Sequence, residues 1–312
     1  MHVRHRFRTS GEFPVTLTVT DDTALENNQA SATVMVTVNA PPEPVIAAPS
    51  AACAAEVVTF DGGQSRDADG AIAHYAWRFG DGSGAEGPQV THSYAAPGRY
   101  PVALLADDGR GLNNSRQQTI LDLHVNRPPR PMAGPDRAVC PGEPVTFDGA
   151  ASNDWDGALV RYRWDFGDGT TAEGQQVVHG FEQPGVYQVR LSVTDDSGSS
   201  CATATDSAQV HVNAPPVAVA GSDRQGFVGG AYDQLLFDGA ASTDVDGQPL
   251  SYLWDLGDGV TRTGEKVLHA YSAPGEYAVR LGVADGTGLA CGQTWDEIKV
   301  DVRSRDQAQA QP

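Results

Sequence analysis

Alternation of apolar and polar residues is the dominant pattern in this 312-residue chain. In residues 187–194 every second side chain is apolar, and residues 34–38, 121–125 and 298–302 alternate in the same way. A period of two places successive side chains on opposite faces, so these segments predict strands with one buried face. Glycine (35 residues) and proline (20 residues) are frequent, and long helical periodicity is absent. The chain is therefore expected to be all-β, with many short strands and turns.

The sequence also repeats with a much longer period. The segment Trp77–Gly82 reads WRFGDG and recurs as WDFGDG at Trp164–Gly169 and as WDLGDG at Trp254–Gly259, with spacings of 87 and 90 residues. Each copy precedes a histidine and then a Pro-Gly-x-Tyr-x-Val-x-Leu strand. A repeat of this length is a whole domain and not a solenoid unit of about 20 to 50 residues. The function is therefore expected to be one that modules perform in tandem.

The first 40 residues match the second half of this repeat. His5 aligns with His92 and His179, and Phe13 aligns with Tyr100 and Tyr187. We therefore expect 1–40 to be the C-terminal half of a truncated module. Whole modules should follow at 41–127, 128–214 and 215–303, with a disordered tail at 304–312. Paired prolines at 41–42, 128–129 and 215–216 predict short, stiff joints.

These motifs resemble the PKD domain, an immunoglobulin-like module. The resemblance rests on Trp164–Gly169, His179–Phe181 and Pro184–Asp195, and on a Ser-x-Asp-x-Asp-Gly loop at 65–70, 152–157 and 242–247. Arg78 and Leu256 are the minor departures from it. The resemblance implies tandem antiparallel β-sandwiches. It also implies a secreted or cell-surface protein, of bacterial or archaeal origin.

Within that family such modules serve as spacers, adhesive units or accessory binding modules. The leading expectation is a non-enzymatic extracellular rod of about 100–130 Å that makes protein–protein or surface contacts. The alternatives are an accessory polysaccharide-binding array of a secreted hydrolase and a subunit of a self-assembling filament. The unpaired strand edges of 1–40 would serve the last alternative, through self-association. We expect 1–40 to be poorly ordered, or docked on another copy or on the next module.

Charge and motif content narrow the function classes. The net charge is −19, and Lys266 and Lys299 are the only lysines, so nucleic acid and anionic lipid are disfavoured partners. No 18-residue apolar stretch predicts a membrane span, and no signal-peptide pattern is visible. No hydrolase, metalloprotease or P-loop motif is present. We predict no catalytic residues and no cofactor other than calcium.

Calcium is suggested by paired aspartates in glycine-ended loops. The pairs are Asp67/Asp69, Asp154/Asp156 and Asp244/Asp246. Hard oxygen ligands clustered in a turn suit Ca²⁺, although each loop lacks the bidentate glutamate of an EF-hand. Ordinary turn chemistry of Asp-Gly segments is the alternative explanation.

Two tryptophans stand outside the repeat pattern. Trp155 occupies a loop position where the other modules have Ala68 and Val245, and Trp295 is out of phase with the apolar positions of its strand. Both side chains are expected to be exposed. Exposed indoles can stack on sugar rings or anchor a protein partner, although single exposed aromatics are also common.

Four cysteines complete the candidates. Cys140 precedes an early strand and Cys201 lies near the start of the last strand of the same module. Since the first and last strands of such a sandwich are neighbours, we predict a Cys140–Cys201 disulfide. Cys53 and Cys291 then have no partner in their own modules. They are left as free thiols or as crosslinks between chains.

Overall fold

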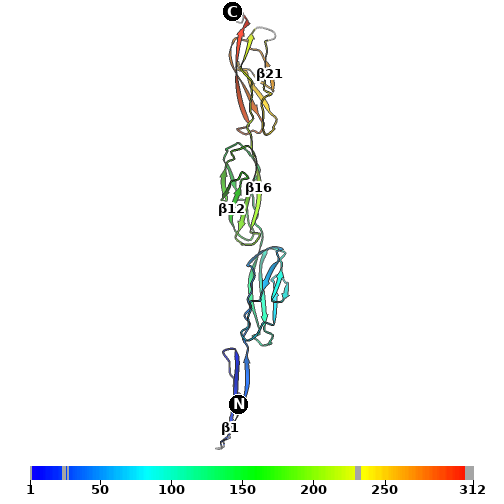
Figure 1. Ribbon diagram of the computed structural model, residues 1–312, viewed down its shortest axis with the longest axis vertical. Coiled ribbons are helices and arrows are strands. Elements are labelled where there is room, and N and C mark those ends of the chain that lie inside the picture. The colour runs from blue at the N-terminus through cyan, green and yellow to red at the C-terminus, as the bar shows by residue number, and fades with distance from the viewer. Residues whose placement is uncertain (1, 23–25, 27, 229–232, 306–312) are drawn as a thin grey trace. The chain divides into compact units, whose positions relative to one another are not determined.

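The computed structural model describes residues 2–22, 26, 28–228 and 233–305 (Figure 1). Its described part contains strands and turns, which confirms the all-β prediction. Residues 306–312 of the predicted tail lie outside the described residues, and the last strand continues to Ser304.

Each whole repeat contributes seven strands. With the half module at 1–40 counted as the first repeat, the whole repeats at 41–127, 128–214 and 215–303 are the second, third and fourth. The second repeat contains β3 (Ala51–Cys53), β4 (Val58–Asp61), β5 (His74–Arg78), β6 (Gly84–Glu86), β7 (Gln89–His92), β8 (Gly98–Asp107) and β9 (Arg116–Asn126). The third contains β10 (Arg137–Val139), β11 (Val145–Asp148), β12 (Leu159–Asp165), β13 (Thr171–Glu173), β14 (Gln176–His179), β15 (Gly185–Asp195) and β16 (Thr203–Val212). The fourth contains β17 (Arg224–Val228), β18 (Leu235–Asp238), β19 (Ser251–Asp255), β20 (Thr261–Thr263), β21 (Lys266–His269), β22 (Gly275–Ala284) and β23 (Gln293–Ser304).

The seven strands form a five-stranded and a two-stranded sheet. In the second repeat the orders are β3-β9-β8-β5-β6 and β4-β7, and the other two repeats have the same topology. The predicted sandwich is thus confirmed, with one difference from a purely antiparallel fold. The first strand of each repeat pairs in parallel with the last, as in Ala51↔His124 and Cys53↔Asn126. This direction brings the end of the first strand to the end of the last strand, beside the joint to the next repeat.

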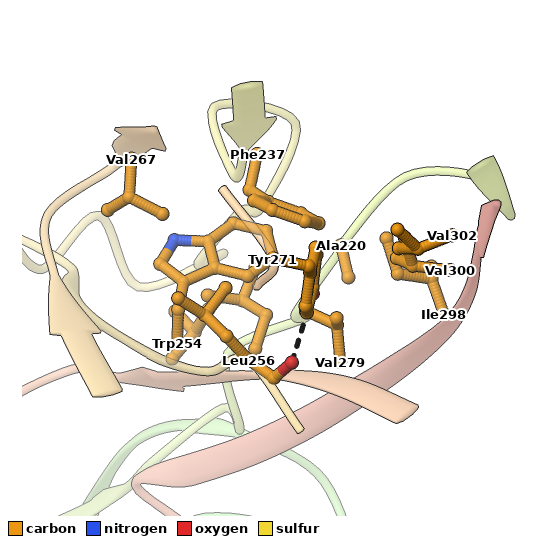
Figure 2. Close-up of a cluster of buried hydrophobic side chains, with 12 residues drawn as sticks. Ala220, Phe237, Trp254, Leu256, Val267, Tyr271, Val279, Ile298, Val300 and Val302 are labelled. Atoms are coloured by element: carbon orange, nitrogen blue, oxygen red, sulfur yellow. Dashed lines mark hydrogen bonds between the residues drawn. The ribbon is translucent and has the colours of Figure 1, made fainter. Parts of the chain in front are cut away.

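A tryptophan lies at the centre of each core. In the fourth repeat Trp254 on β19 packs against Phe237 on β18, with 5.6 Å between ring centroids, and so joins the two sheets (Figure 2). The Tyr271 hydroxyl donates a hydrogen bond of 2.9 Å to the Leu256 carbonyl. Burial of such aromatic side chains supplies much of the free energy of folding of a small sandwich.

The Gly-Asp-Gly turn needs its first glycine. Gly167 has φ of 76°, and a Cβ placed there would lie 2.8 Å from the Gln188 carbonyl oxygen. Asp168 accepts the Thr170 backbone N–H at 2.9 Å, as expected for a carboxylate that closes its own turn. The Tyr187 hydroxyl donates to the Gln183 carbonyl at 2.9 Å, a contact typical of the tyrosine corner of such sandwiches.

Residues from the predicted half module form a hairpin of β1 (Gly11–Thr20) and β2 (Gln29–Val38). One face carries hydroxyls, with Thr16 and Thr33 bonded at 2.9 Å. The other carries apolar side chains, and among them Leu17 is 66% exposed. The expectation of poor order is therefore wrong for these two strands, since ten cross-strand pairs hold the ladder together. Within this chain the apolar face faces solvent.

Candidate functional site: the joints between repeats

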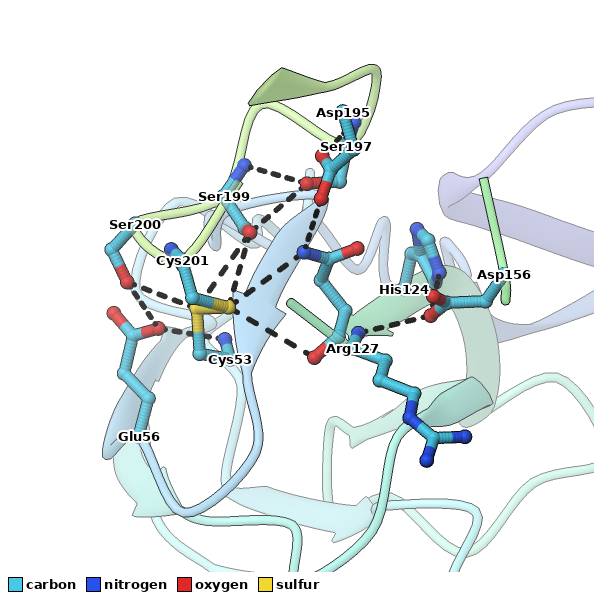
Figure 3. The surroundings of a disulfide bond; sticks show 11 residues. Cys53, Glu56, His124, Arg127, Asp156, Asp195, Ser197, Ser199, Ser200 and Cys201 are labelled. Carbon is cyan, nitrogen blue, oxygen red and sulfur yellow. Dashed lines mark hydrogen bonds and ion pairs between the residues drawn. A yellow bond between two sulfur atoms is a disulfide. The ribbon is translucent and has the colours of Figure 1, made fainter. Parts of the chain in front are cut away.

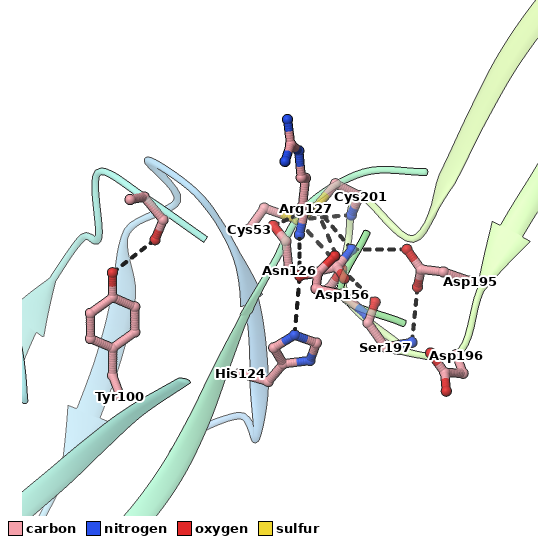
Figure 4. A network of polar contacts seen from close by, with 12 residues as sticks. Cys53, Tyr100, His124, Asn126, Arg127, Asp156, Asp195, Asp196, Ser197 and Cys201 are labelled. Atoms are coloured by element: carbon pink, nitrogen blue, oxygen red, sulfur yellow. Dashed lines mark hydrogen bonds and ion pairs between the residues drawn. A yellow bond between two sulfur atoms is a disulfide. The ribbon is translucent and has the colours of Figure 1, made fainter. Parts of the chain in front are cut away.

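Each joint begins with an asparagine whose side chain reaches into the next repeat. Asn126 ends β9, is fully buried, and donates from Nδ2 to the Asp195 carboxylate at 3.0 Å (Figure 4). Asn213 donates to Asp285 at 2.7 Å in the same way. Buried hydrogen bonds to a charged acceptor are worth more than neutral ones, and the cost of breaking them is larger still. The linker is therefore anchored to the next module by specific side-chain contacts.

The residue after each asparagine makes a second contact. The backbone N–H groups of Ala40, Arg127 and Ala214 donate to the second aspartate of each predicted calcium loop. The three hydrogen bonds are Ala40 to Asp69 at 3.2 Å, Arg127 to Asp156 at 3.0 Å and Ala214 to Asp246 at 2.7 Å. These aspartates thus have a structural partner in the linker.

The first aspartate of each loop has a buried oxygen without a hydrogen-bond partner, and so does Asp69, the second aspartate of the first loop. Asp67 and Asp244 each retain a buried carboxylate oxygen without a hydrogen-bond partner, and both Asp154 oxygens lack one. Burial raises the pKa of Asp67 and of Asp154 above the usual aspartate value, and the adjacent second aspartate adds to the rise.

The side-chain oxygens of the three linker asparagines are also buried and without a partner. These asparagines are Asn39, Asn126 and Asn213. In the described ranges, no cluster of three or more His, Cys, Asp or Glu side chains is placed to hold a metal ion. The unpartnered oxygens nonetheless recur at equivalent positions of all three joints.

The cysteines pair differently from the sequence-based prediction. Cys53 is bonded to Cys201, as Figure 3 shows, with a Cα–Cα distance of 6.0 Å. Cys140 is bonded to Cys291, with a Cα–Cα distance of 5.8 Å. The predicted Cys140–Cys201 pair is therefore wrong. The assignment of Cys53 and Cys291 as unpaired or intermolecular cysteines is wrong as well, since no cysteine is free. Both bonds join one repeat to the next.

Strand direction explains this error. β10 pairs in parallel with β16, with Val139 opposite Val212, so Cys140 follows at the C-terminal end of the last strand. Cys201 lies just before the N-terminal end of that strand. Ten residues of extended chain separate the two ends by about 33 Å, far beyond disulfide reach. First and last strands are indeed neighbours, but these two cysteines lie at opposite ends of the pair.

A signal for the correct pairing was present in the sequence. Cys53 and Cys140 occupy one repeat position, while Cys201 and Cys291 occupy another, one repeat further along. Pairing the first position of one repeat with the second position of the next uses all four cysteines. The contacts within the chain agree with this pairing. Residues 153–160 and 193–204 of the third repeat, the latter with Cys201, form one compact unit with residues 1–130, which include Cys53.

The repeated histidines have structural surroundings. His92 Nε2 lies 2.7 Å from the Asp81 carboxylate, and its ring stacks on Phe79 at a centroid distance of 4.2 Å. His179 and His269 make the equivalent contacts to Asp168 and Asp258. Hydrogen bonds from Ser83, together with His92, lower the pKa of Asp81 to about 2. The histidine–aspartate contact thus recurs in every whole repeat, which suits a scaffold role.

Both singled-out tryptophans are exposed, as predicted: Trp155 by 67% and Trp295 by 51%. The Arg127 guanidinium lies over Trp155, 5.4 Å from the ring centroid. Trp295 lies over Gly282 on the neighbouring strand, where a Cβ would come within 2.8 Å of the indole.

The family model described as PKD domain matches residues 39–121, 126–210 and 213–300. The chain belongs to the PKD-domain family. Among its relatives, polycystin-1 of Homo sapiens is 31% identical in a 243-residue alignment that covers 75% of this chain and 5% of that protein. The dyslexia-associated protein KIAA0319 of Homo sapiens is 30% identical over 94% of this chain and 30% of its own length. This PKD chain therefore spans less than a third of these relatives.

An enzyme name also occurs among the relatives. Collagenase ColA of Clostridium perfringens is 35% identical, over 35% of this chain and 9% of that protein. Among solved structures, the PKD1 domain of Vibrio anguillarum Epp is 25% identical and aligns with 29% of this chain and all of its own, at a TM-score of 0.26. PKD repeats thus occur in relatives with and without an enzyme name. No helix in the described ranges is long and apolar enough to cross a membrane.

Proposed function

We propose that this chain is a non-enzymatic, extracellular spacer in which PKD modules hold neighbouring protein parts at a set separation and make surface contacts. The observation that carries the proposal is the anchored joint. At each of the three joints, a buried asparagine and a backbone N–H bind carboxylates of the next repeat. Flexible beads on a string would not need such contacts. The two disulfides support an oxidising, extracellular compartment.

Small-angle X-ray scattering of the oxidised chain tests the spacer proposal. We expect a maximum dimension on the order of 100–130 Å and a scattering profile of a stiff particle. The four-serine variant at Cys53, Cys140, Cys201 and Cys291 serves as the control, and its profile should be more flexible. A compact or freely flexible particle under oxidising conditions would contradict the proposal.

A polysaccharide-binding role is the second candidate, and Trp295 favours it. Leu253, Gly282 and Trp295 lie in register on one face of β19, β22 and β23. Since Gly282 has no side chain, one face of the indole lies against the sheet and leaves the ring available for stacking. The third repeat has Ser192 and Thr205 at the equivalent positions.

An open depression of about 680 Å³ adjoins Gly282 and offers polar partners, among them Ser251, Thr263, Glu265 and Gln293. A flat aromatic ring beside hydroxyl and amide groups suits a sugar ring, which has an apolar face and a polar rim. Pull-down on insoluble glycans tests this role. Binding should be lost in Trp295→Ala and retained in Trp155→Ala, and retention in the double variant would remove the aromatic argument.

Self-association through the N-terminal hairpin is the third candidate. Val15, Leu17, Val19 and Val34 share an exposed apolar face, a feature associated with interfaces. Sedimentation of the intact chain should show a concentration-dependent dimer, which Leu17→Ser abolishes. Met35→Ser on the opposite face is the matched control. A monomer at all concentrations would exclude this role.

A further inference from the structure

The two disulfides cross each other along the chain. Cys53–Cys201 closes a separation of 148 residues and Cys140–Cys291 one of 151. Cys140 lies inside the first loop, and Cys201 lies inside the second. The two loops therefore overlap, and the two bonds do not hold back independent lengths of chain.

This crossing gives the chain an unusual covalent layout. The two cystines act as two junctions, and three stretches of chain run between them. By residue number these stretches are 87 residues (53 to 140), 61 residues (140 to 201) and 90 residues (201 to 291). Even with every strand unfolded, the junctions can separate only as far as the shortest stretch permits.

We propose that the crossed disulfides make the PKD array a tether of limited extension, whose full length is released only by a thiol reductant. Each cystine is reduced by two equivalents of an external thiol, which yields two cysteine thiols and one external disulfide. All four half-cystines are partly exposed, so a small thiol can approach them. This property goes beyond the spacer role, because it concerns the chain under tension and survives unfolding of the modules.

The expected lengths follow from residue numbers. Without disulfides, the direct path from Cys53 to Cys291 contains 238 residues, or about 810 Å at about 3.4 Å per residue. With both disulfides the path contains 61 residues, or about 210 Å. The crossed pair thus withholds 177 residues, or about 600 Å of chain.

Chains that keep only one of the two disulfides distinguish crossed loops from separate loops. Cys53–Cys201 alone leaves a path of 90 residues, and Cys140–Cys291 alone leaves one of 87. Either bond therefore withholds about 150 residues, while adding the second withholds fewer than 30 more. Separate, uncrossed loops would instead withhold lengths that add.

Single-molecule force spectroscopy of the full chain, held at both ends, tests the proposal. The oxidised chain is unfolded at high force, and dithiothreitol is then added. The contour length should increase by about 600 Å in the parent, and by about 500 Å in Cys53→Ser/Cys201→Ser and in Cys140→Ser/Cys291→Ser. The four-serine variant should not lengthen. Because the length is read from the unfolded chain, a variant that folds poorly still gives a result.

Two outcomes would overturn the proposal. An oxidised parent that already extends to the reduced length would show that the bonds are absent. An increase of about 200 Å, lost in both double variants, would indicate a Cys140–Cys201 bond, since that pair withholds 61 residues.

Discussion

The first joint and the two later joints share an asparagine–aspartate hydrogen bond but differ in the contact beside it. At the first joint, Asn114 stands where Cys201 and Cys291 stand in the next repeats. Its Nδ2 donates to the Asn39 carbonyl at 2.9 Å, and Asn39 in turn donates to Asp108 at 2.7 Å. At the second joint, Asn126 and Asp195 keep the same hydrogen bond, and a disulfide is added beside it.

The difference indicates which contact defines a joint. The asparagine–aspartate hydrogen bond is present in all three, whereas the disulfide is present in two. The polar anchor is therefore the contact that all three joints share, and the disulfide is an additional covalent bond at two of them. The first joint is held by noncovalent contacts, and Asp69, which accepts from the Ala40 N–H, is also paired with Arg110 of its own repeat at 3.0 Å.

Removal of a disulfide should give the largest effect. A loop near 150 residues carries a closure free energy of about 5 kcal/mol in the chain-entropy description, so Cys53→Ser/Cys201→Ser should unfold at markedly lower denaturant concentration. The hairpin and first joint contain no cysteine and should be unaffected. Urea unfolding with hydrogen exchange locates the loss, and an unchanged midpoint would contradict the account.

Loss of the asparagine anchor should rank second. Asn126→Ala leaves the buried Asp195 carboxylate without its donor, at a cost of about 1–3 kcal/mol. Asn39→Ala should cost a similar amount at the first joint, but there it should also raise exchange of the Ala40 amide strongly. With a disulfide present, the second joint should stay closed in Asn126→Ala. Equal hydrogen exchange of the Ala40 amide in Asn39→Ala and of the Arg127 amide in Asn126→Ala would show that the disulfide does not help to keep the second joint closed.

Calcium should act on all three joints alike if it binds the unpartnered oxygens. At a free calcium concentration ten times the dissociation constant, binding to the folded state adds about 1.4 kcal/mol per site to the free energy of unfolding. Asp67→Asn should remove this gain at the first joint. In chelator the same variant should be neutral or stabilising, since burial raises the pKa of Asp67 and so disfavours its charged form. Identical melting curves in millimolar calcium and in chelator would exclude calcium binding at these loops.

An asparagine at position 201 should partly restore the second joint without a covalent bond. Cys53→Ser/Cys201→Asn imitates the first joint, where the same residue type bonds the linker carbonyl. It should be about 1 kcal/mol more stable than Cys53→Ser/Cys201→Ser, the worth of one hydrogen bond. If the two variants unfold at the same denaturant concentration, Asn114 does not fulfil at the first joint the role that the cysteines have at the later joints.

The sequence was sufficient for the fold because its pattern repeats. Three copies of the Gly-Asp-Gly turn and of the alternating strands predicted the tandem β-sandwiches. The disulfide pairing was missed because it depends on strand direction, and alternation does not distinguish parallel from antiparallel pairing. The role of Asn126 was missed as well, since a polar residue before two prolines looks like ordinary linker.

The paired aspartates show the same limit. Their spacing suggested a cation loop, while Asp69, Asp156 and Asp246 bind the preceding linker. This contact joins residues about 30 apart across a joint, where local sequence carries no information on the approach of the two segments. Exposure of Trp155 and Trp295, in contrast, followed directly from their phase in the repeat.

Cystine mapping tests the central claim, that consecutive repeats are bonded to each other, most directly. The oxidised chain is alkylated, digested without reductant and analysed by mass spectrometry. We predict two linked peptide pairs, Cys53 with Cys201 and Cys140 with Cys291, and no alkylated cysteine. Recovery of a Cys140–Cys201 peptide, with Cys53 and Cys291 alkylated, would contradict the account.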